Sequence, residues 1–128
     1  MVGIESGTTE KHILFIDDSP VMLRSVRSIV PKGYKVSIAI NGAQAYKVME
    51  NSMPDLIFLD YEMPEQNGKE LLTEFRSKDN LKDIPVYFMS AKAGDEYMHE
   101  VLDLNPAGFI IKPPSVDRIR AVIEKQLG

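Results

Sequence analysis

Short apolar runs alternate with amphipathic segments along most of the chain. Five runs rich in Ile, Val, Leu and Phe occupy residues 12–16, 35–40, 55–59, 85–89 and 107–111. Each has the length of a strand, and most are continuously apolar, whereas a half-exposed strand would alternate apolar and polar positions. Such runs are typical of parallel strands covered on both faces. The pattern therefore predicts a parallel sheet of five strands inside the protein.

Helical spacing of apolar residues marks the segments between these runs. The predicted helices span residues 21–30, 43–50, 69–76, 95–104 and 116–127. Capping pairs precede two of them, Asn41 with Gln44 and Asn67 with Glu70, and Pro20 suits the first position of a helix. This alternation predicts an α/β fold with a doubly wound parallel sheet, strand order 2-1-3-4-5, and five helices on its two faces.

The length of 128 residues is enough for one domain with a single core. Residues 1–10 are polar and lack the apolar stretch of a secretory signal, so we expect a flexible N-terminal tail and one domain over residues 11–128. No apolar run approaches the roughly 18 to 20 residues that cross a bilayer, which predicts a soluble protein without a membrane partner.

Charge and cysteine content exclude further classes of protein. The 15 basic and 19 acidic side chains leave a formal charge of −4, so attraction to a phosphate backbone is missing and we expect no direct binding to nucleic acid. The chain has no cysteine, which excludes a disulfide framework, a thiolate zinc site and a thiol nucleophile. This composition suits a reducing compartment.

Charged and polar side chains stand where the predicted strands end. Asp17 and Asp18 follow the first strand, Asp60 the third, Ser90 the fourth and Lys112 the fifth. Any one of these acids alone could be a helix cap or a solvated turn. Because carboxyl ends of parallel strands share one sheet edge, we expect the group to converge, and its formal charge of −2 then calls for a divalent cation. Oxygen ligands without His or Cys favour Mg²⁺.

A cation at this edge would allow phosphoryl chemistry on a carboxylate. Asp can form an aspartyl phosphate when a metal and a nearby cation neutralise the phosphoryl oxygens and a hydroxyl donates to them. Asp60, on the central strand, is the best candidate nucleophile, and Asp17 and Asp18 are better placed to hold the ion. Lys112 and Ser90 can supply the cation and the hydroxyl.

Four motifs carry a resemblance to a known family. They are Phe15-Ile16-Asp17-Asp18-Ser19, Leu59-Asp60-Tyr61-Glu62-Met63-Pro64 followed by Gly68, Met89-Ser90-Ala91, and Phe109-Ile110-Ile111-Lys112-Pro113. Together they resemble the response-regulator receiver domain of two-component signalling, of the chemotaxis-regulator type, over residues 11–127. Each motif alone is weak, but four in the right order and spacing are specific. The resemblance implies a flavodoxin-like receiver fold.

The resemblance also implies a role for each site residue. Asp60 is expected to accept the phosphoryl group, and to bind Mg²⁺, for which Mn²⁺ can substitute, together with Asp17, Asp18 and the backbone carbonyl of Glu62. Lys112 is expected to pair with the phosphate and to precede a cis peptide bond to Pro113. The resemblance further implies a conformational switch of two residues, in which Ser90 moves to bond the phosphoryl group and Phe109 turns inward behind it.

Partners and location follow from the same resemblance. The implied phosphodonor is a histidine kinase or a histidine phosphotransfer protein in the cytoplasm. The implied output is binding of a downstream protein or output domain to the face formed by the fourth helix, fifth strand and fifth helix. The domain is expected to be no enzyme beyond its own self-phosphorylation and autodephosphorylation. The kinase, the target, the oligomeric state and the extent of any longer chain stay open.

The same residues allow other interpretations. Phe109 could be an ordinary core aromatic and Lys112 a lysine that reaches solvent. An aspartate-nucleophile phosphatase of the haloacid-dehalogenase type, a flavodoxin-like flavin binder and a receiver-shaped dimerisation module are the rival functions. A further hypothesis pairs Glu62 with Lys92 across the mouth of the site, where the pair would hinder water and prolong the acyl phosphate. Asn105, before Pro106, is expected to suit a left-handed helix end.

Overall fold

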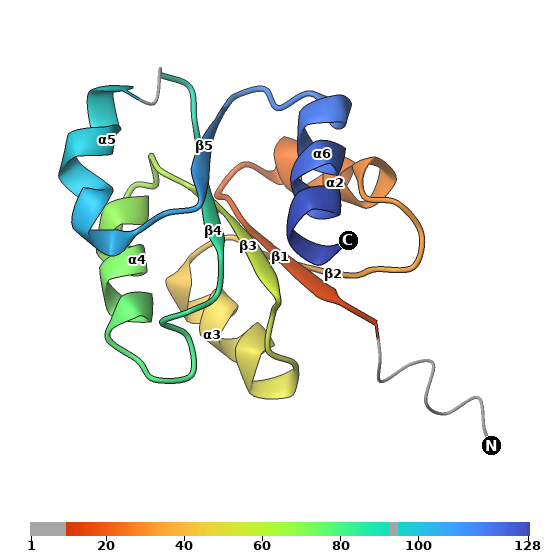
Figure 1. Ribbon diagram of the computed structural model, residues 1–128, viewed down its shortest axis with the longest axis horizontal. Helices are drawn as coiled ribbons and strands as arrows, with labels where there is room; N and C mark the ends of the chain where they lie inside the picture. The colour runs from red at the N-terminus through yellow and green to blue at the C-terminus, as the bar shows by residue number, and fades with distance from the viewer. Residues whose placement is uncertain (1–9, 93–94) are drawn as a thin grey trace.

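The computed structural model describes residues 10–92 and 95–128, in which strands and helices alternate as predicted (Figure 1). The strands are β1 (His12–Ile16), β2 (Lys35–Ala39), β3 (Leu56–Asp60), β4 (Val86–Ser90) and β5 (Gly108–Ile111). The α helices are α2 (Pro20–Ile29), α3 (Gly42–Asn51), α4 (Gly68–Arg76), α5 (Asp95–Val101) and α6 (Val116–Leu127). A 3₁₀ turn, η1 (Leu102–Leu104), follows α5.

The five strands form one parallel sheet in the order β2-β1-β3-β4-β5. Helices α2 and α6 cover one face of the sheet, and α3, α4 and α5 cover the other (Figure 1). The predicted strand order and doubly wound arrangement are therefore confirmed. In the register, Asp60 is the partner of Met89 and Ser90 is the partner of Ile111, so the carboxyl ends of β3, β4 and β5 lie along one edge.

Burial on both faces explains why the central strands have unbroken apolar sequences. Every residue of β1, β3 and β4 is buried. Alternate residues of β1 enter different cores: Leu14 and Ile16 pack under α3 and α4, whereas Ile13 and Phe15 pack under α2 and α6. In the second core Phe15 stacks on Phe58 with ring centroids 4.7 Å apart. Both faces of the central strands are thus removed from water, as the hydrophobic effect requires of such sequences.

Helix starts follow the predicted caps with one difference. Asn67 and Glu70 form a complete capping box, each side chain accepting the other's backbone N–H at 2.9 Å. Asn41 likewise accepts from the Gln44 N–H at 2.9 Å. The Gln44 side chain, however, accepts from the N–H of Ile40, one residue before the cap, at 3.0 Å. The reciprocal half of that predicted box is therefore shifted by one residue.

The predicted helix over residues 95–104 is shorter than expected. The α-helix ends at Val101, and η1 completes the segment before Asn105 adopts the left-handed conformation at φ 52° and ψ 57°. The left-handed helix end predicted for Asn105 is thus confirmed. The predicted N-terminal tail lies outside the described residues, apart from exposed Glu10. None of the described helices is long and apolar enough to cross a membrane.

Arg76, at the end of α4, joins three parts of the chain. Its guanidinium donates to the carbonyls of Leu104 at 2.7 Å and Asn105 at 3.2 Å, which lie after α5. It also donates to the carbonyls of Ile84 at 2.9 Å and Lys82 at 3.1 Å, which lie before β4. Burial lowers the pKa of Arg76. One planar side chain therefore donates to four backbone carbonyls in two separate segments of the chain.

We predict that Arg76→Met lowers the free energy of unfolding by about 2 to 3 kcal/mol, because it leaves partly buried carbonyls without a donor. Arg76→Lys should recover only part of the loss, since an ammonium cannot serve four carbonyls from one plane. Urea unfolding measures both values, with exposed Arg27→Met on α2 as the control. Equal losses for Arg76→Met and Arg27→Met would contradict this role.

Candidate functional site

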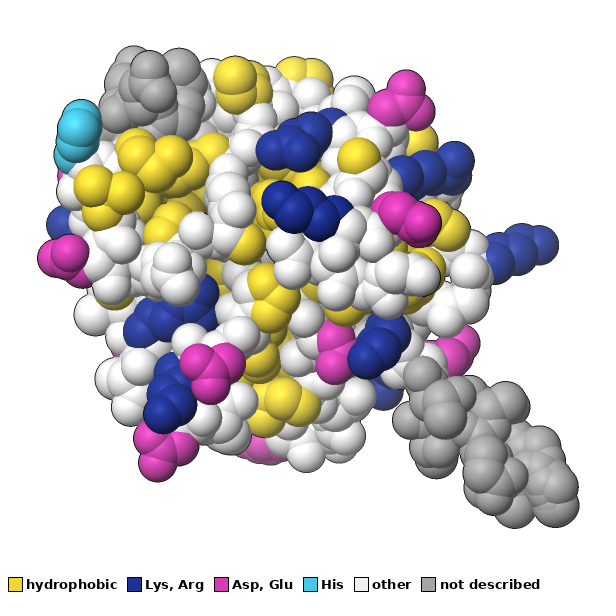
Figure 2. Space-filling view, viewed as in Figure 1, with side chains coloured by type: hydrophobic (Ala, Val, Ile, Leu, Met, Phe, Trp, Pro, Cys, Tyr) yellow, Lys and Arg dark blue, Asp and Glu magenta, His cyan; other side chains and the backbone are white. Residues whose placement is uncertain are grey.

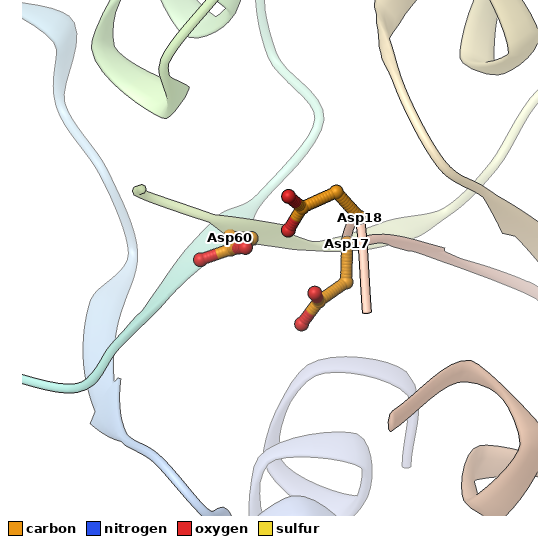
Figure 3. Close-up of side chains that lie close together, drawn as sticks. All are labelled: Asp17, Asp18 and Asp60. Carbon is orange, nitrogen blue, oxygen red and sulfur yellow. The ribbon is translucent and has the colours of Figure 1, made fainter. Parts of the chain in front are cut away.

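Three carboxylates meet at the carboxyl edge of the sheet. Asp17 and Asp18 follow β1, and Asp60 is the last residue of β3; ligand atoms from all three lie within 4.8 Å of one another (Figure 3). Asp17 and Asp60 are buried, whereas Asp18 is exposed. Because β1 and β3 are neighbours in the sheet, the fold itself forces the two buried acids together. The convergence predicted for these acids is confirmed.

Lys112, directly after β5, reaches across the sheet edge to the two buried acids. Its Nζ lies 3.0 Å from Asp17 Oδ2 and 3.2 Å from Asp60 Oδ1. Burial alone would lower the pKa of Lys112, but the attraction of Asp17 and then of Asp60 outweighs it and raises the pKa. The ammonium therefore stays charged and bridges β1, β3 and β5. This contact excludes the alternative in which Lys112 simply extends into solvent.

The Asp60 carboxyl group is poorly accommodated as an anion. Burial and, next, the charge of Asp17 raise the pKa of Asp60 from 3.8 to about 7, against the opposing attraction of Lys112. The backbone N–H of Glu62 donates to Asp60 Oδ1 at 3.2 Å and also favours the anion. One ammonium thus offsets only part of the charge that the acids bring together.

The donor set fits a hard divalent cation. The three acids supply only oxygen atoms, as Mg²⁺ prefers, and with Lys112 they leave a formal charge of −2. The buried Oδ2 of Asp17 meets Lys112 Nζ at 3.0 Å, but the same ammonium also serves Asp60, so the three carboxylates keep negative charge that a further cation would neutralise. A Mg²⁺ ion would be held by Asp17, Asp18 and Asp60.

Glu62 connects this site to the start of the β4–α5 loop. Its Oε2 accepts from the Ser90 hydroxyl at 2.5 Å, and its Oε1 lies 3.4 Å from the Ala91 N–H, which donates to it. The buried Ser90 Oγ in turn accepts from the N–H of Lys92 at 3.1 Å. The Lys92 side chain is exposed. The hypothesis that Glu62 and Lys92 together prolong an acyl phosphate therefore stays a prediction, while the contact of Glu62 with Ser90 is new.

Gly68 lets helix α4 begin directly beneath the Asp60 loop. A Cβ at this position would lie 2.7 Å from the Asp60 carbonyl oxygen and 2.9 Å from the Tyr61 Cα. The Gly68 N–H donates to the Tyr61 carbonyl at 2.9 Å, and the Tyr61 N–H donates to the Met89 carbonyl at 2.8 Å. The backbone directly after Asp60 is therefore held against α4 and β4, which fixes the position of this residue at the sheet edge.

An aromatic row leads from this loop to Phe109. The Tyr61 ring lies 5.1 Å from Phe88, and Phe88 lies 5.3 Å from Phe109, measured between centroids. The Tyr61 hydroxyl donates to Glu100 Oε1 on α5 at 2.7 Å. Phe109 itself is half-buried and not fully enclosed in the core. The sequence motifs gave Tyr61 no role, although its place directly after Asp60 indicated that it lies close to the site.

Two further features lie at opposite ends of the sheet. The Lys112–Pro113 peptide bond is cis, as the motif implied. His12 lies at the amino edge, away from the acids, with its Nε2 2.7 Å from Ser37 Oγ and with its pKa lowered by burial.

Without a cation, the raised pKa of Asp60 should make stability fall as pH rises. The folded state keeps a proton on Asp60 up to about pH 7 that the unfolded state loses near pH 3.8, so unfolding is favoured as pH rises between these values. We predict that Asp60→Asn, in a metal chelator, gains on the order of 2 to 3 kcal/mol relative to the unsubstituted chain between about pH 5 and pH 8. Urea unfolding at both pH values measures the gain; a pH-independent difference would contradict it.

Comparisons with known proteins agree with this geometry. The sequence model of the response regulator receiver domain matches residues 13–124. The chain is 42% identical over 107 residues to a protein-glutamate methylesterase/protein-glutamine glutaminase of Treponema denticola, covering 80% of this chain and 28% of that protein. It is 29% identical over 128 residues to the transcriptional regulatory protein PrrA of Mycobacterium tuberculosis, covering 96% and 54%. The fold matches the solved structure of chemotaxis protein CheY4 of Vibrio cholerae with a TM-score of 0.84 at 22% identity, covering 92% and 99%.

The family match favours a receiver domain over two of the rivals that the sequence left open, the aspartate-nucleophile phosphatase and the flavin binder. The chain spans 54% or less of the curated relatives it matches, so the similarity concerns one domain of those proteins. Proteins of the matched family act by phosphorylation of an Asp, which is neither phosphatase activity nor flavin binding. With its five parallel strands, its acids at the sheet edge and the match over residues 13–124, the chain belongs to the response regulator receiver domain family of two-component signalling.

Proposed function

We propose that Asp60 is the phosphoacceptor of this receiver domain and takes its phosphoryl group from a phosphohistidine on a histidine kinase or a histidine phosphotransfer protein. The observation that carries the proposal is the Asp60 carboxylate, buried beside Asp17 and held by Lys112 at 3.2 Å. The family acts by phosphorylation of an Asp, and Asp60 is the acid on the central strand. The family likeness also supports the cytoplasm as the place of this exchange.

The proposed transfer moves one phosphoryl group between two side chains. An Asp60 carboxylate oxygen attacks the phosphorus, the new P–O bond forms as the P–N bond to the imidazole breaks, and the freed imidazole takes a proton from water. Asp17, Asp18, Asp60 and the backbone carbonyl of Glu62 would hold Mg²⁺, which would supply charge neutralisation for the phosphoryl oxygens. Lys112, directly after β5, contributes a second positive charge, and its raised pKa keeps the ammonium charged.

A hollow beside Lys112 supports a protein as the phosphodonor. It has a volume of about 470 Å³, lies between α2 and the segment after β5, and is lined mainly by apolar side chains that include Val21, Met22 and Pro113. Val21 is 69% exposed, so it presents an apolar side chain to solvent at this hollow. A helix of the donor seated there would bring its histidine close to Asp60.

The proposed output surface is the face formed by α5, β5 and α6. Apolar side chains gather over α5 on the face shown in Figure 2. Leu102 is 58% exposed, and Ile111, which is 59% exposed, lines a hollow of about 560 Å³ together with Phe109 and Arg118. Phe109 is one of the residues that line this hollow, so its movement would alter the surface that a partner meets. The formal charge of −4 favours a protein over nucleic acid as that partner.

The proposed switch links Asp60 to this face through Ser90 and Phe109. A phosphoryl group on Asp60 attracts the Ser90 hydroxyl, and the space that Ser90 leaves favours an inward Phe109. Phe88 contacts both Tyr61 and Phe109, so a change at the end of β3 has a packed route to β5. The same chemistry accounts for proposed self-phosphorylation from small phosphodonors and for autodephosphorylation by water.

Acetyl phosphate with Mg²⁺ tests the phosphoacceptor directly. We predict that the intact chain gains the mass of one phosphoryl group on Asp60 and that Asp60→Asn gains none. Lys112→Met should slow the gain by about tenfold or more, because a charge within contact of the reacting group is lost. Exposed Asp79→Asn is the control and should react normally. Peptide mapping that places the phosphoryl group elsewhere, or no uptake at all, would favour the dimerisation module instead.

Backbone hydrogen exchange tests the proposed output surface. We predict that phosphorylation changes exchange in α5 and β5 by about threefold or more, because the switch residues pack between them and Asp60. Helix α3, which lies on the other side of α4, should change less. The comparison uses the chain with Mg²⁺ alone and with Mg²⁺ plus acetyl phosphate. Changes confined to α3, or absent throughout while Asp60 is phosphorylated, would contradict this choice of face.

A further inference from the structure

Glu62 makes two contacts that the proposed phosphorylation would have to break. Its carboxylate accepts from the Ser90 hydroxyl at 2.5 Å and from the Ala91 N–H at 3.4 Å. These are one side-chain donor and one backbone donor, aimed at a single anion. Ser90 is buried, so its hydroxyl is shielded from water, and Glu62 Oε2 accepts from it. The carboxylate therefore occupies a small anion-binding pair of donors beside the phosphorylation site.

We propose that the Glu62 carboxylate is a built-in competitor of the phosphoryl group for Ser90 and Ala91. The inference rests on the proposed phosphorylation of Asp60. In the unphosphorylated chain Glu62 holds the Ser90 hydroxyl away from the place where a phosphoryl group would need it. Phosphorylation then has to displace a carboxylate before the switch can form. Glu62 is a positioning residue in this scheme, since it acts through Ser90 and not on the phosphorus.

Position in the chain makes this competition effective. Glu62 is two residues from Asp60, and its own N–H donates to Asp60 Oδ1 at 3.2 Å, so its backbone is tied to the acceptor. Its side chain ties the same loop to the start of the β4–α5 segment. A dianionic phosphoryl group and the Glu62 carboxylate cannot both occupy one pair of donors, because like charges at contact distance repel. Arrival of the phosphoryl group therefore favours release of Glu62.

The neighbouring contact of Tyr61 extends the consequence to α5. The Tyr61 hydroxyl donates to Glu100 Oε1, so the two residues that follow Asp60 hold both the beginning of the β4–α5 loop and the helix after it. Release of Glu62 frees the beginning of that segment while Tyr61 still holds the helix. The Glu62 carboxylate thus determines how readily the proposed output face responds to phosphorylation.

The first test needs neither metal nor phosphate. In the unphosphorylated chain with a metal chelator, Glu62→Ala should make the Ala91 amide exchange with solvent about fivefold faster or more, because its acceptor is gone. Glu65→Gln, an exposed acid in the same loop, is the matched control and should leave the Ala91 amide unchanged. Equal exchange in Glu62→Ala and the unsubstituted chain would overturn the competitor.

The second test separates competition for Ser90 from simple charge repulsion. With acetyl phosphate and Mg²⁺, Glu62→Ala should be phosphorylated about threefold faster or more than the unsubstituted chain, and Glu65→Gln at the normal rate. In a Ser90→Ala background the same Glu62→Ala change should have almost no effect, because the contested hydroxyl is absent. An equal acceleration in both backgrounds would show repulsion alone and overturn the proposal.

The same experiment distinguishes failure of this inference from failure of the proposed function. If the unsubstituted chain takes up no phosphoryl group on Asp60, the proposed function itself is wrong. If that chain is phosphorylated normally and Glu62→Ala changes neither the Ala91 exchange nor the rate, only the competitor is wrong.

Discussion

The structure depends on an electrostatic constraint at one edge of the sheet. Asp17 and Asp60 are buried on neighbouring strands, and the nearby Asp18 adds a third negative charge. Burial of like charges is unfavourable, and the raised pKa of Asp60 expresses that cost. Lys112 relieves it only in part. The site is therefore an incompletely neutralised centre that gains from an added cation and can respond to an added phosphoryl group.

The surrounding fold keeps this unfavourable arrangement in place. Two hydrophobic cores fix β1, β3 and β4 on both faces, so the acids cannot separate without exposing buried apolar residues. Gly68 admits α4 directly against the loop after Asp60. Arg76 holds the other end of α4 to the segments before β4 and after α5. Strain at the site is thus opposed by packing elsewhere, which is a general requirement for a functional centre.

Much of the fold and of the acid cluster could be predicted from the sequence, because both follow from local pattern. Continuous apolar runs reveal strands buried on two faces, and Asp17, Asp18 and Asp60 stand directly at strand ends. Contacts of long side chains could not be predicted in this way. Glu62 reaches Ser90, 28 positions away, and Tyr61 reaches Glu100, 39 positions away, only because the loops and α5 come together in three dimensions.

The shorter helix α5 illustrates the same limit on a smaller scale. Apolar spacing continues to Leu104, yet the α-helix ends at Val101, because helix ends depend on backbone hydrogen bonds and not on spacing alone. Asn105 carried the clearer signal, since a left-handed residue ends the segment. Local chemistry at a terminus was therefore more informative than the periodicity that leads to it.

Paramagnetic Mn²⁺ tests the central claim most directly, since it broadens the NMR signals of amides near its binding site and binds to the oxygen ligands that suit Mg²⁺. Titration into the unphosphorylated chain should broaden the amides of Asp17, Asp18 and Asp60 first and leave those of His12 and Lys35, which pair at the amino edge of the sheet, the least affected. Addition of Mg²⁺ should restore the signals. Broadening centred on another part of the surface, or equal broadening at both edges, would contradict a cation site built from these three acids.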